Sequence, residues 1–369
     1  MMNNSQKQIA LGILVFILCS MAFYFFYWIK TPAYSLSMVR DAVQKHDVQA
    51  FEKHVDLDTL LPKAFDDALV AQGKITGENL LDNAFTAAIV QAMKPGVVSM
   101  LKAETLSNIQ GKGNDSEVQG KNNDQKKMAN GLKEKTDFQN SEIKEVSTLS
   151  KEDNIAIVST EIYNKKLNKT FTVNFKMAKL DDGTWKVKEI SNFVNFLVEI
   201  DKAEKDKLAE INKPIKEKID KILKMKGGNG SIDNDGNPFF ATHWITFNTN
   251  FKNIGDKDIT SFRYVISISK SNDSSKKELA KFYCESNNYI AKGKTIMDER
   301  SFDLNPFIPN QKTIIDERSF DLNPFIPNQK TIIDLGLSGS KIDITIYYIH
   351  FANGNAISLY SQIPDEKEE

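Results

Sequence analysis

An apolar segment near the start of the chain constrains its fold more than any other feature. No charged side chain occurs between Lys7 and Lys30, and Ile9–Ile29 consists almost entirely of apolar residues, with an aromatic cluster at its end. A helix of about 20 apolar residues is long enough to cross the hydrocarbon layer of a membrane, and aromatic rings are favoured at headgroup depth. We therefore predict that residues 1–30 form a short tail and one transmembrane helix.

Two other interpretations of this segment are weaker. A signal peptidase would cut after Ala22, because Ser20 and Ala22 are small residues at a suitable spacing. The apolar run continues to Ile29, however, and this favours an uncleaved anchor. Lipid attachment at Cys19 is rejected, because bulky residues precede this cysteine where processing needs small ones.

The flanking charges and the layout of the chain favour opposite orientations of the predicted helix in the membrane. Lys30, Arg40 and Lys45 follow the segment and only Lys7 precedes it, so the positive-inside count slightly favours a cytoplasmic soluble part. A very short tail before a long soluble part is typical of an exported signal anchor, and large domains are exported regardless of charge. We expect a single-pass protein of the bacterial inner membrane whose soluble part is extracytoplasmic.

Composition excludes several classes of protein. The 48 Lys and Arg residues balance the 49 Asp and Glu residues, which argues against a dedicated nucleic-acid-binding protein. The two cysteines lie far apart, which excludes a disulfide scaffold and a cysteine-rich zinc module. We expect no cofactor, no metal and no nucleic-acid partner. The 369 residues suffice for two small domains with connectors.

Residues 31–192 are predicted to form a small α+β domain that begins with helices. Apolar residues recur at helical spacing through residues 35–108, with Ser35, Asp47 and Asp58 as N-caps of three successive helices. Because proline removes a helical hydrogen bond, we predict a break in a fourth helix at Pro95-Gly96.

The rest of this domain is predicted to be a loop followed by an antiparallel β-meander. Residues 111–140 are polar and contain several glycines, so we predict a mobile loop. Asp181-Asp182-Gly183 is a strong hairpin signal. Alternating patterns predict four antiparallel strands, namely Ile143–Leu149, Ile155–Tyr163, Phe171–Leu180 and Trp185–Ile190.

A helical period returns in residues 193–226, which we predict to be a connector helix. Pro214 predicts a kink or a break near residue 213. The helix either packs along its own domain or forms a dimerising coil, so a homodimer through it stays open. Residues 227–237 are rich in glycine, asparagine and aspartate, and we predict an interdomain hinge.

Residues 238–362 have an all-β pattern, and the acidic tail 363–369 follows. Several strands at this spacing suggest a two-sheet sandwich of immunoglobulin type. The fold class expected for the whole chain is therefore α+β, with a transmembrane helix before it and a sandwich at its end. The strand candidates are His243–Asn253, Ile259–Ser269, Glu278–Glu285, Ile342–Phe351 and Ala356–Tyr360.

The sandwich region contains an exact internal duplication. Residues 298–315 recur without change at 316–333, and identity at every position indicates a recent copying event or an assembly error. Two copies do not make a solenoid, which needs at least three units. We predict that one copy occupies the native strand positions and that the other is extruded as a loop or an extra hairpin.

One polar cluster in the helical region is a candidate for chemistry. His46, His54, Asp56 and Asp58 combine imidazole with carboxylate, a pairing that serves acid–base catalysis or metal binding. The simpler interpretation is that Asp47 and Asp58 cap helices and that the histidines lie at the surface or its boundary. We therefore predict no catalytic residues, with these four as weak candidates.

Two regions resemble known families. Pro32, Tyr34, His46-Asp47 and Val55-Asp56 match the Pro-Tyr turn, helical hairpin and Val-Asp pair of an uncharacterised family of bacterial membrane-anchored proteins. That resemblance implies an envelope location and supplies no activity. The stretch Phe251–Gly255, together with Tyr264, resembles extracytoplasmic immunoglobulin-like modules.

These observations favour binding over catalysis. We expect a membrane-anchored envelope protein that contacts lipid through its N-terminal helix and acts as a non-catalytic binding or assembly module. Its partner would be a protein or a cell-surface polymer. The alternative is a membrane-tethered hydrolase that uses carboxylates and histidine from the helical part.

Overall fold

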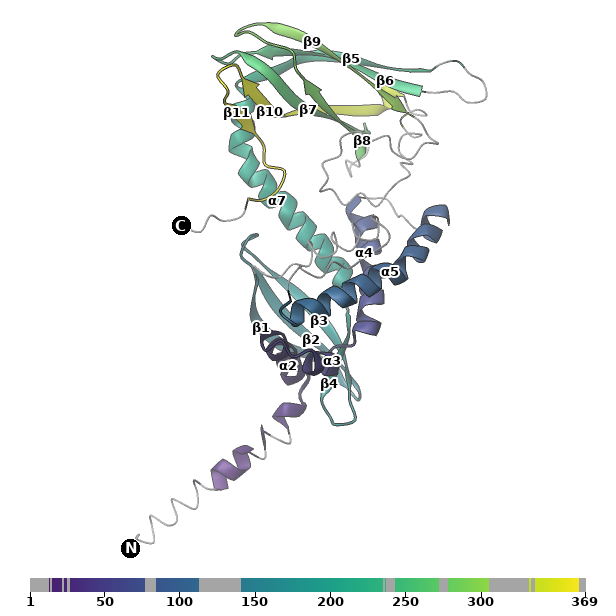
Figure 1. Ribbon diagram of the computed structural model, residues 1–369, viewed down its shortest axis with the longest axis vertical. Coiled ribbons are helices and arrows are strands. Elements are labelled where there is room, and N and C mark those ends of the chain that lie inside the picture. Colours follow the sequence, from purple (N-terminus) through teal and green to yellow (C-terminus); the bar gives the residue numbers. More distant parts are fainter. Residues whose placement is uncertain are drawn as a thin grey trace. The chain divides into compact units, whose positions relative to one another are not determined.

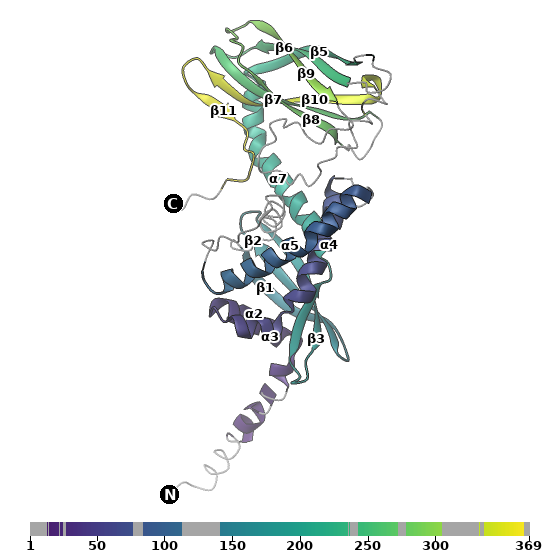
Figure 2. The same cartoon turned by 45° about the vertical axis from the view of Figure 1, so that its right-hand side comes forward.

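The computed structural model describes two compact units, Met1–Ala203 and Glu204–Glu369, and the boundary between them falls within one helix. The first unit combines helices with an antiparallel sheet, and the second combines the end of the shared helix with two antiparallel sheets (Figures 1 and 2). The chain is therefore α+β, as expected. The described residues are 13, 15–21, 23–24, 27–76, 84–112, 141–234, 236, 243–271, 278–304, 332 and 336–364.

The predicted membrane segment lies partly outside these residues. Its described positions between 13 and 24 are helical and expose large apolar side chains, with Phe16 at 73%. Within the described residues, no helix meets the length and hydropathy that a membrane crossing requires. The transmembrane helix therefore stays a prediction.

The first unit begins with helices whose ends differ in part from the predicted ones. Asp47 caps its helix as predicted, since its carboxylate accepts a hydrogen bond from the Ala50 amide. Ser35 is not a cap, because Thr31 takes that position and is followed by Pro32, a residue suited to the first helical turn. The helices are η1 (Trp28–Lys30), α2 (Pro32–Gln44), α3 (Val48–His54), α4 (Leu57–Thr76) and α5 (Ala84–Ile109).

Helix α5 is continuous through Pro95, so the predicted break at Pro95-Gly96 is wrong. Val90 and Val97, two turns apart, are both buried. Burial on either side of the proline stabilises the helix where one backbone hydrogen bond is lost.

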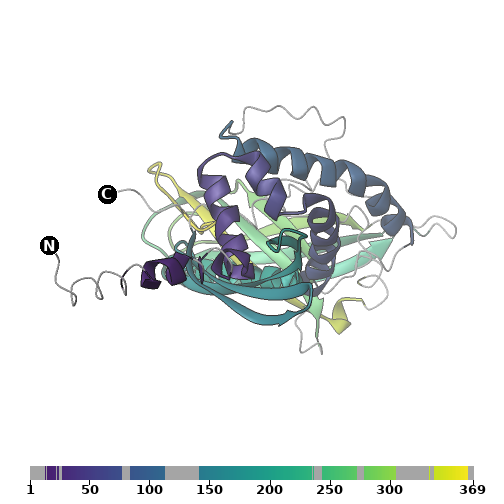
Figure 3. The same ribbon diagram turned by 90° about the horizontal axis from the view of Figure 1, so that it is seen from below.

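A four-stranded antiparallel meander completes this unit, and the predicted strands and hairpin turn are confirmed. Seen from below, the purple and blue helices lie on one side of the teal sheet (Figure 3). One core joins α2, α3 and α5 to the sheet, and a second joins α4 and the start of α7 to it. The strands, in sheet order, are β1 (Ser141–Glu152), β2 (Ile155–Asn164), β3 (Lys169–Lys179) and β4 (Trp185–Ile190).

Strand β1 is an edge strand with irregular pairing. Its register against β2 shifts between Ile143 and Glu145 and again between Thr148 and Ser150, which makes Lys144 and Leu149 bulge residues. Leu149 is 61% exposed. The predicted mobile loop before β1 falls mostly on residues 113–140, outside the described residues.

The connector is a continuous helix, α7 (Phe193–Asp220), which contains Pro214 without a break. The apolar residues of its first half belong to the core of the first unit, and Ile215 and Ile219 belong to that of the second. A homodimer through this helix stays a prediction.

The predicted hinge at residues 227–237 is largely wrong, because β5 (Leu223–Asn234) pairs with β6 over most of it. At Gly228 the glycine serves close strand packing instead. A Cβ added at Gly228 would lie 2.5 Å from the Asn248 carbonyl oxygen, so only glycine fits there.

The second unit contains two antiparallel sheets that share one core. One sheet has the order β5-β6-β9 and the other β11-β10-β7-β8. The rings of Phe251 in β6 and Phe262 in β7 lie 4.8 Å apart, so residues of both sheets meet in this core. The remaining elements are β6 (His243–Asn253), β7 (Ile259–Lys270), β8 (Glu278–Ser286), β9 (Thr295–Leu304), η4 (Leu337–Gly339), β10 (Ser340–Phe351) and β11 (Ala356–Ser358).

The first copy of the duplication supplies strand β9, as predicted for one copy. Residues 298–304 pair with β6 from Thr249 back to His243. Of the second copy, only Ile332 is described, and it is buried in the core. The predicted extrusion concerns residues outside the described part of the chain.

Candidate functional site

The two histidines of the predicted polar cluster bond to different backbone segments. His46 is exposed at the end of α2 with a φ of 57°, and its Nδ1 donates to the Ile109 carbonyl at 2.9 Å. His54 is buried, and its Nδ1 donates to the Trp185 carbonyl at 3.0 Å. The surface position predicted for His54 is wrong, because this ring joins α3 to β4.

The two carboxylates of that cluster also bond to different partners. Asp56 accepts hydrogen bonds from the backbone amide and the hydroxyl of Thr59, at 3.2 and 3.0 Å, and forms an ion pair with Lys188. Asp58 is 78% exposed and lies 2.6 Å from Lys102. Asp56, rather than the predicted Asp58, therefore caps the start of α4.

The ion pair has a clear electrostatic effect on Asp56. The hydrogen bond from Lys188 holds the pKa of Asp56 below its usual value, and the bonds from Thr59 act in the same direction. This carboxylate is therefore ionised at neutral pH and fixed in a capping position. Within the described residues, no group of three or more metal-ligating side chains is present.

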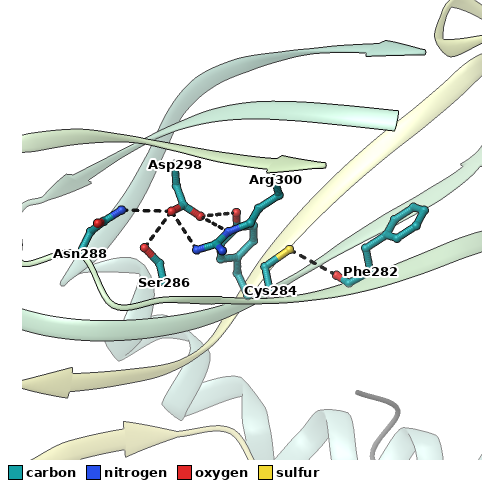
Figure 4. Close-up of polar contacts among 7 residues, drawn as sticks. Phe282, Cys284, Ser286, Asn288, Asp298 and Arg300 are labelled. Carbon is teal, nitrogen blue, oxygen red and sulfur yellow. Dashed lines mark hydrogen bonds and ion pairs between the residues drawn. The ribbon is translucent and has the colours of Figure 1, made fainter. Parts of the chain in front are cut away.

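A buried polar network lies in the second unit, where no sequence pattern indicated one. We call it the Asp298 cluster, and it consists of Tyr264, Ser286, Asn288, Asp298 and Arg300. Figure 4 shows the Asp298 carboxylate at its centre, between Ser286 and Asn288 on one side and Arg300 on the other. Asp298 is only 3% exposed.

Five hydrogen bonds satisfy the Asp298 carboxylate. Oδ1 accepts from Ser286 Oγ at 2.9 Å, from Asn288 Nδ2 at 3.2 Å and from Arg300 Nη2 at 3.0 Å. Oδ2 accepts from Tyr264 Oη at 2.7 Å and from Arg300 Nε at 2.9 Å. Because Tyr264 and Ser286 belong to one sheet and Asp298 and Arg300 to the other, the cluster ties the two sheets together.

Burial sets the protonation states around this cluster. Burial raises the pKa of Tyr264 far above its usual value and raises that of the neighbouring Cys284 thiol to about 11. Burial alone would lower the pKa of Arg300, but its contacts with Asp298 outweigh this and raise it. Tyr264 and Cys284 are therefore neutral at physiological pH, and the cluster holds one ion pair, between the buried Asp298 and the half-buried Arg300.

The outward side of the same β7–β8–β10 sheet carries aromatic and charged residues that are exposed or half-buried. We call these residues the tyrosine face, and they are Arg263, Tyr283, Glu285, Tyr347 and Tyr348. The Arg263 guanidinium lies 5.0 Å from the centre of the Tyr348 ring and 3.2 Å from a Glu285 oxygen. Tyr283 and Tyr347 meet edge to face, with ring centres 6.3 Å apart.

The strand period connects the tyrosine face to the Asp298 cluster beneath it. In β7, Arg263 points outward and the next residue, Tyr264, points inward to Asp298. In β8, Tyr283 and Glu285 are exposed on either side of the buried Cys284. Tyr264 is paired with Cys284, and Arg263 with Glu285. The hydrogen bonds from Tyr264 and Ser286 to Asp298 therefore fix the strands that display the outward residues.

Tyr347 is the bulge residue of β10 on this face. The register against β7 shifts between Ile346 and Tyr348, which inserts Tyr347 as an extra residue. Its burial raises its pKa above the usual value. The bulge places two tyrosines side by side on one face, an arrangement that simple alternation in the sequence would not predict.

In comparisons with known proteins, no family model matches the chain and no curated sequence is significantly similar to it. The resemblances based on Pro32–Asp58 and on Phe251–Gly255 therefore remain predictions.

Proposed function

We propose that this protein is a single-pass, membrane-anchored envelope protein whose soluble part binds a protein or a cell-surface polymer without catalysis. The N-terminal helical positions support the anchor. Phe16, Leu18 and Phe23 are each more than half exposed, and large apolar side chains of this kind are stabilised by transfer from water into lipid.

The strand order of the second unit supports an immunoglobulin-like module. Sheets of order β5-β6-β9 and β11-β10-β7-β8 correspond to strands A-B-E and G-F-C-C′ of such sandwiches. This architecture occurs in many cell-surface domains, and the recognition properties of each come from its own surface residues.

The tyrosine face is the observation that carries the binding proposal. Tyrosine and arginine are enriched among the residues that contribute most to protein recognition. Tyrosine presents a large contact area at a low entropic cost. Here Arg263, Tyr283 and Tyr348 are also held in place by ring and ion-pair contacts with one another and with Glu285 and Tyr347. A partner therefore meets a preorganised surface.

Photo-crosslinking in intact cells tests this proposal. A photoreactive phenylalanine at Tyr283 should capture a specific partner, identified by mass spectrometry, and Arg263→Ala with Tyr347→Ala should abolish the capture. The same probe at Met297, which is 61% exposed on the other sheet, is the matched control. An identical set of products at Tyr283 and Met297 would contradict binding through the tyrosine face.

A further inference from the structure

Strand β9 presents two different faces to its surroundings. Ile296 and Phe302 pack against the core, and the Phe302 ring lies 4.6 Å from that of Phe282. Asp298 and Arg300 lie between them in the Asp298 cluster. Met297, on the opposite face, is 61% exposed. The inward residues therefore determine which sequence fits this position beside β6.

A second segment of the chain has nearly the same sequence as β9. Thr313–Leu322 repeats Thr295–Leu304 at nine of ten positions, because Lys312–Ile315 before the second copy resembles Lys294–Met297 before the first. The single difference replaces the exposed Met297 by Ile315. All four inward residues recur unchanged, as Ile314, Asp316, Arg318 and Phe320.

We propose that the β9 position has two interchangeable occupants, Thr295–Leu304 and Thr313–Leu322, and that the chain exchanges one for the other. Thr313–Leu322 lies outside the described residues, and its sequence offers the same inward side chains for the core, Asn288 and Tyr264. The exchange transfers 18 residues from the connection after β9 to the connection before it. Loop-closure entropy depends only logarithmically on length, so the two arrangements differ little in this respect.

The turn before β9 favours the first occupant. Gly293 has a φ of 77°, and its amide donates to the Asn253 carbonyl at 3.0 Å. Gln311 precedes the second segment at the equivalent place, and a side chain is strained at positive φ. Thr295–Leu304 is therefore the major occupant and Thr313–Leu322 the minor one.

Cysteine pairs distinguish the two occupants in the full-length protein. Thr246 in β6 is paired with Ser301, and their hydroxyl oxygens lie 3.1 Å apart on the outward face. Thr246→Cys with Ser301→Cys should form a disulfide under mild oxidation, and it serves as the positive control. Thr246→Cys with Ser319→Cys, which we call the exchange pair, should form the equivalent disulfide within a fraction of the chains. A Cys19→Ser background removes the exposed native thiol.

Asparagine substitutions then shift the exchange in opposite directions. Asp298→Asn removes the carboxylate of the first occupant only, so the disulfide of the exchange pair should increase several-fold and become the major product. Asp316→Asn should reduce that disulfide below its original level. If the disulfide of the exchange pair is absent within single chains in the Asp298→Asn background, or forms only between chains, the proposal is wrong.

Discussion

The two units of the molecule use charged residues in opposite ways. In the first unit, Asp56 and Asp58 lie at the start of a helix and pair with lysines near the surface. In the second, the buried Asp298 pairs with Arg300 of the same strand and accepts hydrogen bonds from Tyr264 and Ser286 of the other sheet. The comparison shows that the sequence candidates for chemistry have separate structural roles, with Asp56 as a helix cap. A five-residue polar network, in contrast, is centred on a strand whose sequence looked ordinary.

The largest expected effect comes from breaking the buried pair. In a chain without residues 305–322, which retains a single copy of the repeat, Asp298→Asn should lower the free energy of unfolding of the second unit by about 3 kcal/mol. The reason is that Arg300, whose side chain is 31% exposed, would lose its charge partner. Urea unfolding measures the loss.

Asp58→Asn is the matched control from the first unit. Its exposed pair with Lys102 is screened by solvent, so this substitution should leave the stability unchanged within error. Equal losses for the two substitutions would remove the contrast between the units.

Alkaline pH should destabilise the second unit. The folded pKa of Cys284 is about 11, above its unfolded value, so the thiol binds its proton more tightly in the folded state. Stability is therefore complete below about pH 9 and falls as pH rises, by about 2 kcal/mol at pH 11, and the raised pKa of Tyr264 acts in the same direction. Urea unfolding at several pH values, with Cys284→Ala for comparison, measures this slope. A slope unaffected by Cys284→Ala would exclude this thiol as a source.

A smaller effect is expected at the cap of α4. Asp56→Ala should destabilise the first unit by about 1 kcal/mol, because the Thr59 amide loses its acceptor. Asp56→Asn keeps an acceptor for Thr59 and loses only the charge interaction with Lys188, so its loss should be smaller. Thermal unfolding of both variants measures the difference. An equal loss for Asp56→Asn and Asp56→Ala would assign the main contribution to the ion pair.

The smallest effect concerns the duplication. Deleting residues 298–315 should leave the melting temperature unchanged or higher, since the remaining copy still supplies a complete β9 and the connections become shorter. Calorimetry of the shortened chain measures this. A large decrease in melting temperature would mean that both copies are structural.

Regular local patterns predicted much of the fold. Alternation located the meander strands and most strands of the second unit, and Asp47 was recognisable as a cap from its position before a helical pattern. Predictions failed where a distant contact decided the structure. The Ser35 hydroxyl accepts a hydrogen bond from the Trp185 amide, 150 residues away, and is therefore not used as a cap.

The polar sites were less predictable than the strands. Glycines in β5 had the composition of a linker, and the requirement for glycine at Gly228 comes from the close approach of Asn248, which the local sequence does not show. Asp298 and Arg300 are separated by one residue, as in many exposed strands. The neighbouring sequence does not predict that Asp298 is buried. Tyr264 and Ser286 reach Asp298 only because their sheet packs against the sheet that contains β9, and local sequence patterns do not show this packing.

The bulges of β1 limit how this edge of the first unit can associate with other chains. Lys144 and Leu149 interrupt its pleat and leave only the four residues from Glu145 to Thr148 in uninterrupted register between them. A strand from a neighbouring molecule would need a continuous ladder of donors and acceptors to extend the sheet. Where many copies crowd the same surface, this edge resists polymerisation into fibres.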